Sequence, residues 1–159
     1  MSDGWTDEAP DPGEFATIRL VRVPTTGGIQ GICTSNEVLG KWTHWDNFRT
    51  QPCPGDNCPL CLAGKPKRWQ GYISMMNQMT HRQHVVQVTP LAKKALDEAK
   101  QQYGHLRGLL ILLGRIAKRN NARITVETRQ LAQPVPDLLQ PVDIPRYMAL
   151  IWQSNGDLT

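Results

Sequence analysis

The sequence of 159 residues contains neither a long hydrophobic run nor the pattern of a secretory leader. Its apolar run at residues 109–113 suits a buried strand, whereas a membrane-spanning helix needs about 18 or more apolar residues. The N-terminus has no basic segment followed by an apolar core, so no signal peptide is expected. These absences favour a cytoplasmic protein. In a reducing compartment, clustered cysteines bind metal more often than they form disulfides.

Patterns typical of enzymes are missing as well. The sequence shows no Ser-His-Asp set, no cluster of paired carboxylates and no glycine-rich phosphate loop, so the protein is expected not to be an enzyme. A helix-turn-helix pair is also missing, because the one clear helix, residues 90–103, carries charges of both signs. A regulator that binds double-stranded DNA is therefore disfavoured.

The composition predicts one globular domain, because 40% of the residues are hydrophobic and 20% are charged. The predicted helix has Thr89 as its N-cap, Pro90 as its first residue and Gly104 as its C-terminal stop. A short second helix is predicted over residues 145–153. Strand patterns occur at residues 15–23, 29–38, 67–79, 84–88, 107–116 and 123–129.

This order of elements predicts a mainly β fold, an OB-fold-like Greek-key barrel spanning residues 15–153. A zinc-binding subdomain is expected as an insertion at about residues 42–66. Residues 1–14 are predicted to be a flexible acidic tail, which is the expected contact for replication or recombination proteins.

The charge is unevenly distributed along the chain. Residues 1–14 contain five acidic and no basic side chains, so the net charge of +4 becomes +9 for the rest of the protein. A basic body with a short acidic arm indicates a polyanionic partner, although a merely solvated surface has the same composition.

Three cysteines and a histidine form the most specific motif of the sequence. Cys58 and Cys61 have the two-residue spacing of a zinc knuckle, and Cys53 lies in a turn-rich loop just before them. His44 is the nearest candidate for the fourth ligand, and Cys33 is the alternative. These residue types predict a structural Zn²⁺ site that holds the insertion folded.

Two other interpretations of the cysteines are disfavoured. A thioredoxin-like redox pair needs a helix that begins within the motif, and the prolines and glycines around Cys58-Pro59-Leu60-Cys61 predict no helix there. A catalytic zinc needs an open coordination position and a nearby base, and no Glu lies beside His44.

Basic and aromatic residues crowd both flanks of the zinc motif. Cations that follow phosphates and flat rings on which bases stack are the two requirements for binding single strands. The candidate contacts are Lys41, Trp42, Trp45, Arg49, Lys67, Arg68, Trp69 and Tyr72, with a second basic group at Arg115, Lys118 and Arg119. Some of these rings are expected to pack in the core instead.

The order of ligands resembles that of the zinc-bearing OB-fold single-stranded DNA-binding proteins of phage T4 type. The likeness covers mainly residues 40–72 and is carried by Thr43-His44-Trp45, Pro52-Cys53, Asn57-Cys58-Pro59-Leu60-Cys61 and Trp69-Gln70-Gly71-Tyr72. This chain is shorter, has tighter ligand spacings and has an acidic rather than a basic N-terminus. The resemblance implies zinc-dependent binding of single-stranded DNA, with His44, Cys53, Cys58 and Cys61 as ligands.

The sequence thus predicts a single-stranded DNA-binding protein with little sequence preference, for which RNA is a second possible ligand. Roles in replication or recombination, in a phage or a mobile element, are compatible with it. The alternative is a zinc-ribbon adaptor that makes protein–protein contacts within a nucleoprotein complex.

Overall fold

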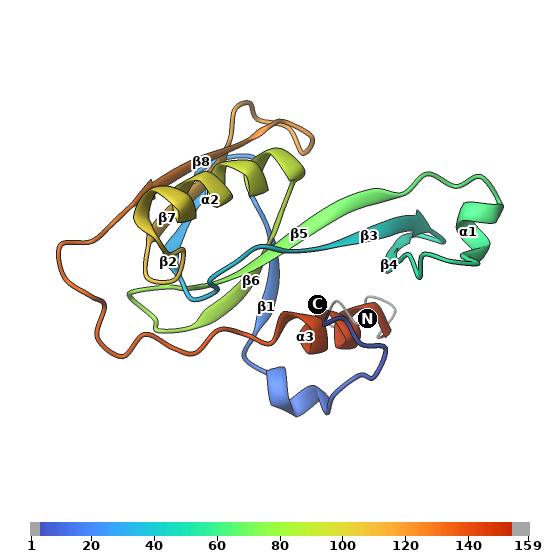
Figure 1. The fold of residues 1–159 in the computed structure, drawn as a ribbon, viewed down its shortest axis with the longest axis horizontal. Helices are drawn as coiled ribbons and strands as arrows, with labels where there is room; N and C mark the ends of the chain where they lie inside the picture. Colours follow the sequence, from blue (N-terminus) through green and yellow to red (C-terminus); the bar gives the residue numbers. More distant parts are fainter. Residues whose placement is uncertain (1–3, 154–159) are drawn as a thin grey trace.

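A computed structural model describes residues 4–153 of the chain, and it confirms a mainly β protein (Figure 1). One sheet contains eight strands: β1 (Arg19–Arg22), β2 (Ile29–Cys33), β3 (Leu39–Asp46), β4 (Arg49–Pro52), β5 (Arg68–Met76), β6 (Gln83–Val88), β7 (Leu110–Arg115) and β8 (Ile124–Arg129). The described helices are a short 3₁₀ turn, η1 (Pro12–Phe15), and the α-helices α1 (Pro59–Leu62), α2 (Pro90–Tyr103) and α3 (Ile144–Gln153).

The long strand β5 organises the sheet. The strand order is β1-β6-β5-β2-β7-β8, and β3 pairs with both β4 and β5. All of these pairings are antiparallel except that of β1 with β6. The first half of β5 pairs with β3 and its last two residues pair with β2. The strand predicted over residues 29–38 therefore ends at Cys33, and residues 34–38 connect β2 to β3. At this break the amides of Thr34 and Ser35 both donate to the Ser74 carbonyl.

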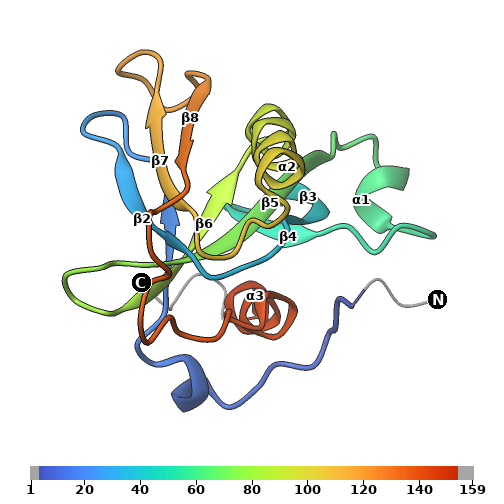
Figure 2. The same ribbon diagram turned by 60° about the vertical axis from the view of Figure 1, so that its left-hand side comes forward.

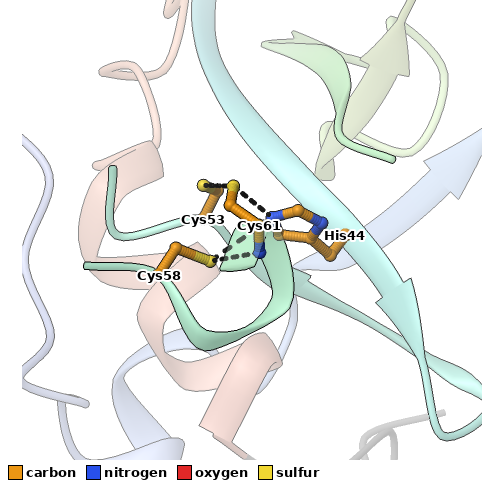
Figure 3. A group of neighbouring side chains, drawn as sticks. All are labelled: His44, Cys53, Cys58 and Cys61. Atoms are coloured by element: carbon orange, nitrogen blue, oxygen red, sulfur yellow. Dashed lines mark hydrogen bonds between the residues drawn. The ribbon is translucent and has the colours of Figure 1, made fainter. Parts of the chain in front are cut away.

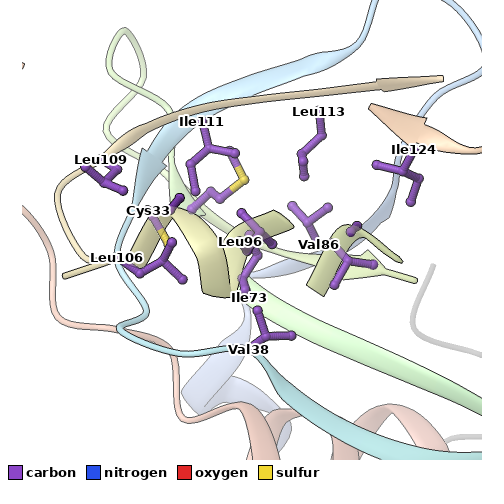
Figure 4. Close-up of a cluster of buried hydrophobic side chains, with 14 of the residues drawn as sticks. Cys33, Val38, Ile73, Val86, Leu96, Leu106, Leu109, Ile111, Leu113 and Ile124 are labelled. Carbon is purple, nitrogen blue, oxygen red and sulfur yellow. The ribbon is translucent and has the colours of Figure 1, made fainter. Parts of the chain in front are cut away.

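The two faces of the sheet carry separate hydrophobic clusters, because side chains alternate along a strand. Ile73 and Val86 belong to the larger cluster, which α2 covers with Leu96 (Figure 4). The neighbouring residues Tyr72 and Val85 point to the other face and pack against α3. Figure 2 shows α2 and α3 on opposite sides of β5.

The predicted helix over residues 90–103 is confirmed with its caps. The hydroxyl of Thr89 accepts a hydrogen bond from the amide of Ala92 at 3.3 Å, and Pro90 occupies the first turn. Gly104 ends the helix with φ = 84°, a left-handed conformation that glycine adopts readily. The predicted second helix is α3, which starts one residue earlier than expected.

The N-terminal segment, predicted as a flexible tail, makes several contacts with the rest of the fold. The indole nitrogen of Trp5 donates to the Gly40 carbonyl at 3.1 Å, and the Trp5 ring contacts the rings of Tyr72 and Trp152. Glu14 forms a 2.7 Å ion pair with Arg146 of α3. One partly buried indole and one ion pair therefore connect the segment to the rest of the fold despite its acidic composition. Residues 1–3 of the predicted tail lie outside the described residues.

Within the described residues, no helix has both the length and the apolar character that crossing a membrane requires.

A close contact at the junction of β3 and β5 yields a stability prediction. A Cβ atom placed on Gly40 would lie 1.8 Å from the Trp69 ring, whose far edge also lies against Gly71. Gly40→Ala is therefore expected to displace Trp69 and to lower the free energy of unfolding by about 1–3 kcal/mol in urea denaturation. Gly114→Ala is the control, because the nearest neighbour there is the Thr125 hydroxyl at 3.2 Å. Equal losses in both variants would contradict this account of Gly40.

Candidate metal centre and adjoining groove

The four predicted metal ligands come from the arm formed by β3, β4 and α1, which extends from the body of the sheet (Figure 1). His44 lies on β3 opposite Gln51 of β4. Cys53 directly follows β4, and its amide donates to the Trp42 carbonyl at 2.8 Å, which continues the hairpin by one residue. The β3–β4 hairpin thus fixes two of the ligands relative to each other.

The other two cysteines are held by a single helical turn. Cys58 is the N-cap of α1, and its sulfur accepts a hydrogen bond from the amide of Cys61 at 3.5 Å. Pro59 is the first residue of this helix, and Gly64, with φ = 78°, follows its end. The prediction that no helix forms here is wrong, since α1 begins directly after Cys58. Its four residues still differ from the long helix of a redox motif.

The ligand atoms of His44, Cys53, Cys58 and Cys61 all lie within 4.8 Å of one another (Figure 3). Nε2 of His44 is 3.4 Å from the sulfur of Cys58 and 3.3 Å from that of Cys61, and the sulfurs of Cys53 and Cys61 are 3.6 Å apart. Ligands at the usual metal distances in a tetrahedral site are separated by about 3.5–3.8 Å. The residues therefore fit a tetrahedral metal ion.

The hydrogen bonding of His44 orients its ring for metal binding. Nδ1 lies 2.9 Å from the carbonyl oxygen of Pro66, which can only accept, so Nδ1 carries the proton. Nε2 is then unprotonated and points at the three sulfurs. A carbonyl that fixes the tautomer of a ligating histidine is a regular part of metal sites.

The thiols are also prepared unequally for coordination. The backbone N–H of Cys61 is the main cause that lowers the pKa of Cys58, to about 7. The adjacent sulfur of Cys53 is the main cause that raises the pKa of Cys61, to about 11. Crowded sulfurs cannot all ionise without a cation between them, so this cluster favours a bound metal ion.

Cys33, the alternative fourth ligand, is excluded by its position. It is buried in the larger hydrophobic cluster, where its thiol donates to the Ser35 carbonyl at 3.2 Å. Burial raises the pKa of Cys33 to about 12, so this cysteine is an inert core residue.

A groove of about 850 Å³ adjoins the metal centre. The β3–β4 hairpin, with Trp45 and Phe48, contributes lining residues along one part of it, and α3, with Ile151 and Trp152, contributes others. Strands β1, β5 and β6 and residues 66–67 complete the lining. Among residues 4–153, four cationic side chains line the groove and no acidic ones do: Arg22, Arg49, Lys67 and Arg68.

The groove and the metal centre use opposite faces of the same strand. Thr43 and Trp45 alternate with His44 along β3, and Thr43 and Trp45 line the groove while His44 points at the cysteines. Directly paired residues share a face, so Arg68, opposite Thr43, also lies on the groove side. The carbonyl of Pro66 that binds His44 is followed at once by Lys67 and Arg68. The candidate metal ligands thus lie directly behind part of the groove wall.

The structure brings together only some of the predicted nucleic-acid contacts. Trp45, Arg49, Lys67 and Arg68 line the groove, and so does Tyr72. Tyr72 is only 1% exposed, however, with its ring against Trp5 and Trp152, so it offers no face to a base. Tyr72 is therefore a core residue and not the stacking residue that the sequence predicted.

Three further candidates lie elsewhere. Trp42 is half-exposed on the opposite face of β3, and the ammonium of Lys67 lies 5.1 Å from its ring centroid, so Lys67 lines the groove while its charge lies toward Trp42. Trp69 shares that face and packs against the larger hydrophobic cluster. Lys41 lies 6.0 Å from the centroid of the Trp5 ring and does not line the groove.

The second basic group is separate from the groove. Arg115 donates to the carbonyls of Val23 and Ala122, and burial, with a smaller effect of the Arg22 charge, lowers its pKa. It therefore helps to hold the β7–β8 hairpin. Lys118 lies with Arg115 in another hollow that also contains Glu127, and Arg119 is exposed on the same hairpin turn.

Several groove residues escaped the sequence analysis. Arg22, Gln70, Gln87 and Trp152 come from β1, β5, β6 and α3, so no local motif joins them. The alternation along β5 was the available signal, because Arg68, Gln70 and Tyr72 share one face.

Comparison of the chain with protein-family models, with curated proteins and with solved structures finds no match. The interpretation of the site therefore depends on its geometry and chemistry.

The geometry predicts about one metal ion per chain, measurable by mass spectrometry of the purified protein. Cys58→Ser is expected to lose the metal and to lower the midpoint of thermal unfolding by roughly 5 °C or more, because the cysteine-rich loop loses its crosslink. Cys33→Ala is the control and should retain the metal. A metal-free wild-type protein with the same thermal stability as the loaded form would contradict the assignment.

Proposed function

We propose that the protein binds single-stranded nucleic acid, with DNA as the first candidate, in the groove between the β3–β4 hairpin and α3. The observation that carries this proposal is the lining of the groove, which combines four cationic side chains with aromatic rings and, in the part of the chain that the structure describes, contains no acidic side chain.

The cations supply the part of binding that is independent of sequence. Each Lys or Arg that neutralises a phosphate releases condensed counterions, which makes the affinity fall with salt. Lys67 and Arg68 are exposed beside the sheet, and Arg22 lies at the exposed end of β1. A nucleic-acid strand bound along these three side chains would cross the part of this face of the sheet that α3 does not cover.

The rings favour an unpaired strand. Stacking on a side chain requires a base with an uncovered face, and every base inside a duplex has both faces covered by its neighbours. Trp45 is 64% exposed on the groove side of β3, so its indole is available for such a contact. The same arrangement supports binding of single-stranded RNA.

Zn²⁺ is the metal that the donor set favours, because three thiolates and one imidazole in a tetrahedron are typical of structural zinc. We assign it a structural role, since four protein ligands leave no coordination position open. His44 and Pro66 would connect the ion to Lys67 and Arg68. The remaining strands would then form an OB-like barrel, with the arm of β3, β4 and α1 as its insertion.

A zinc-ribbon adaptor is the second candidate, and one observation favours it. Leu62, at the end of α1, is 81% exposed and lies outside the groove. This candidate requires Leu62 to belong to a larger apolar patch, because extended patches, and not single apolar side chains, mark protein contacts. Leu62→Ala would then abolish a protein interaction while leaving the binding of an oligonucleotide unchanged.

The proposal predicts salt-dependent binding of oligothymidine, measured by fluorescence anisotropy. Arg68→Gln is expected to weaken binding and to reduce the slope of log affinity against log salt by about 0.7, the contribution of one phosphate contact. The matched control is Lys94→Gln, which removes one positive charge from the exposed surface of α2.

Two outcomes would contradict this function. One is an affinity for oligothymidine that does not change with salt. The other is an equal loss in Arg68→Gln and Lys94→Gln, which would show that only the net charge matters. Preference for a duplex of the same length over the single strand would favour another mode of binding.

A further inference from the structure

The turn between β3 and β4 contains an unusual residue for its backbone conformation. Asp46 pairs with Arg49, so only Asn47 and Phe48 connect the strands, with φ values of 55° and 63°. Two positive φ values define the hairpin turn in which glycine is strongly favoured at the second position. A bulky aromatic residue there is strained, because its Cβ crowds the backbone.

Packing within the fold does not explain this choice. The side chain of Phe48 is 90% exposed, so the described structure gains almost no burial from it. Met79 provides a comparison, because it is 93% exposed in the turn between β5 and β6 but does not have a positive φ. Phe48 combines backbone strain with exposure of a large apolar ring, and both are unfavourable for the isolated chain.

The position of Phe48 indicates where a bound ligand would contact the ring. Together with Trp45 and Arg49 it lines the groove on the hairpin side, while Ile151 and Trp152 of α3 line it elsewhere. Lys65 of the cysteine-rich loop lies 3.9 Å from Asp46, which links the base of this turn to the metal lobe. The ring is therefore presented from a supported hairpin, next to a cation and a second exposed ring.

We propose that Phe48 is a base-stacking residue of the groove, and that its strained backbone position keeps the ring directed toward the ligand. This inference rests on the proposed function and specifies what the groove binds. One unpaired base of the nucleic acid separates from the adjacent base and stacks on the Phe48 ring instead. Strands whose bases stack strongly on one another, such as oligoadenine, are then bound more weakly than oligothymidine.

The test uses opposite changes in binding and in stability. Phe48→Gly removes the ring and relieves the strain, so its affinity for oligothymidine should fall roughly tenfold or more, while the thermal midpoint should rise by about 2 °C. A purely structural role of Phe48 would lower both. Phe48→Tyr retains a ring and should bind within about twofold of the wild type.

A fluorescent adenine analogue placed within an oligothymidine reports stacking directly. Its emission should change on binding to the wild type and to Phe48→Tyr, and the change should be lost with Phe48→Gly. Met79→Ala is the control for removal of an exposed apolar side chain, and its affinity should equal that of the wild type.

The outcomes separate this inference from the proposed function. Failure of the wild type to bind any single strand would refute the function itself. Binding of the wild type with unchanged affinity in Phe48→Gly would overturn the role of Phe48 and leave the function intact. A fall in the thermal midpoint of Phe48→Gly would also overturn the inference, because it would show that the ring serves the fold.

Discussion

The alternation of side chains along β3 is the constraint on which the rest of the site depends. Consecutive residues of a strand point to opposite faces, so His44 joins the three cysteines while Thr43 and Trp45 face the groove. Pairing with β5 continues this division, because Arg68 lies opposite Thr43 and Trp69 lies opposite Trp42. A shift of the register by one residue would exchange the two faces, separating the histidine from the sulfurs and placing the indole of Trp45 among them.

The candidate metal centre and the groove therefore share the same backbone, because both are formed by side chains of β3 and by residues 66–68. The cysteine-rich loop has little hydrophobic core of its own, since α1 has four residues and contains no buried residue. The four candidate ligands converge where this lobe lacks a core, and the carbonyl of Pro66 connects the imidazole to the start of β5. In small metal-dependent folds, coordination supplies the stability that apolar burial cannot, and the proposed zinc ion would do the same here. The position of two groove cations follows from the same contacts.

Local features of the molecule were predictable from the sequence, and features that combine distant segments were not. The candidate metal ligands lie within 18 residues of one another in a segment rich in turns, and the capping residues of α2 directly flank that helix in the sequence. Short-range rules therefore identified both. Predicting the groove would have required the sheet topology. Arg22 reaches it only because β1 pairs with β6, and Trp152 reaches it only because α3 packs on this face of the sheet. Tyr72 was misassigned because the sequence does not show that α3 covers that face of β5. The contact of Trp5 with Gly40 was not predicted, because a single aromatic residue in an acidic segment forms no sequence pattern.

The contact between Trp5 and Trp152, with ring centroids 5.6 Å apart, brings the two ends of the described chain together. Adjacent ends permit circular permutation, in which a short peptide joins them and the chain is opened elsewhere. The turn around Met79, at the far end of the β5–β6 hairpin, is an exposed place for the new ends. A fluorescent protein inserted at the β5–β6 turn would lie far from the β3–β4 hairpin and would leave access to the groove clear (Figure 1).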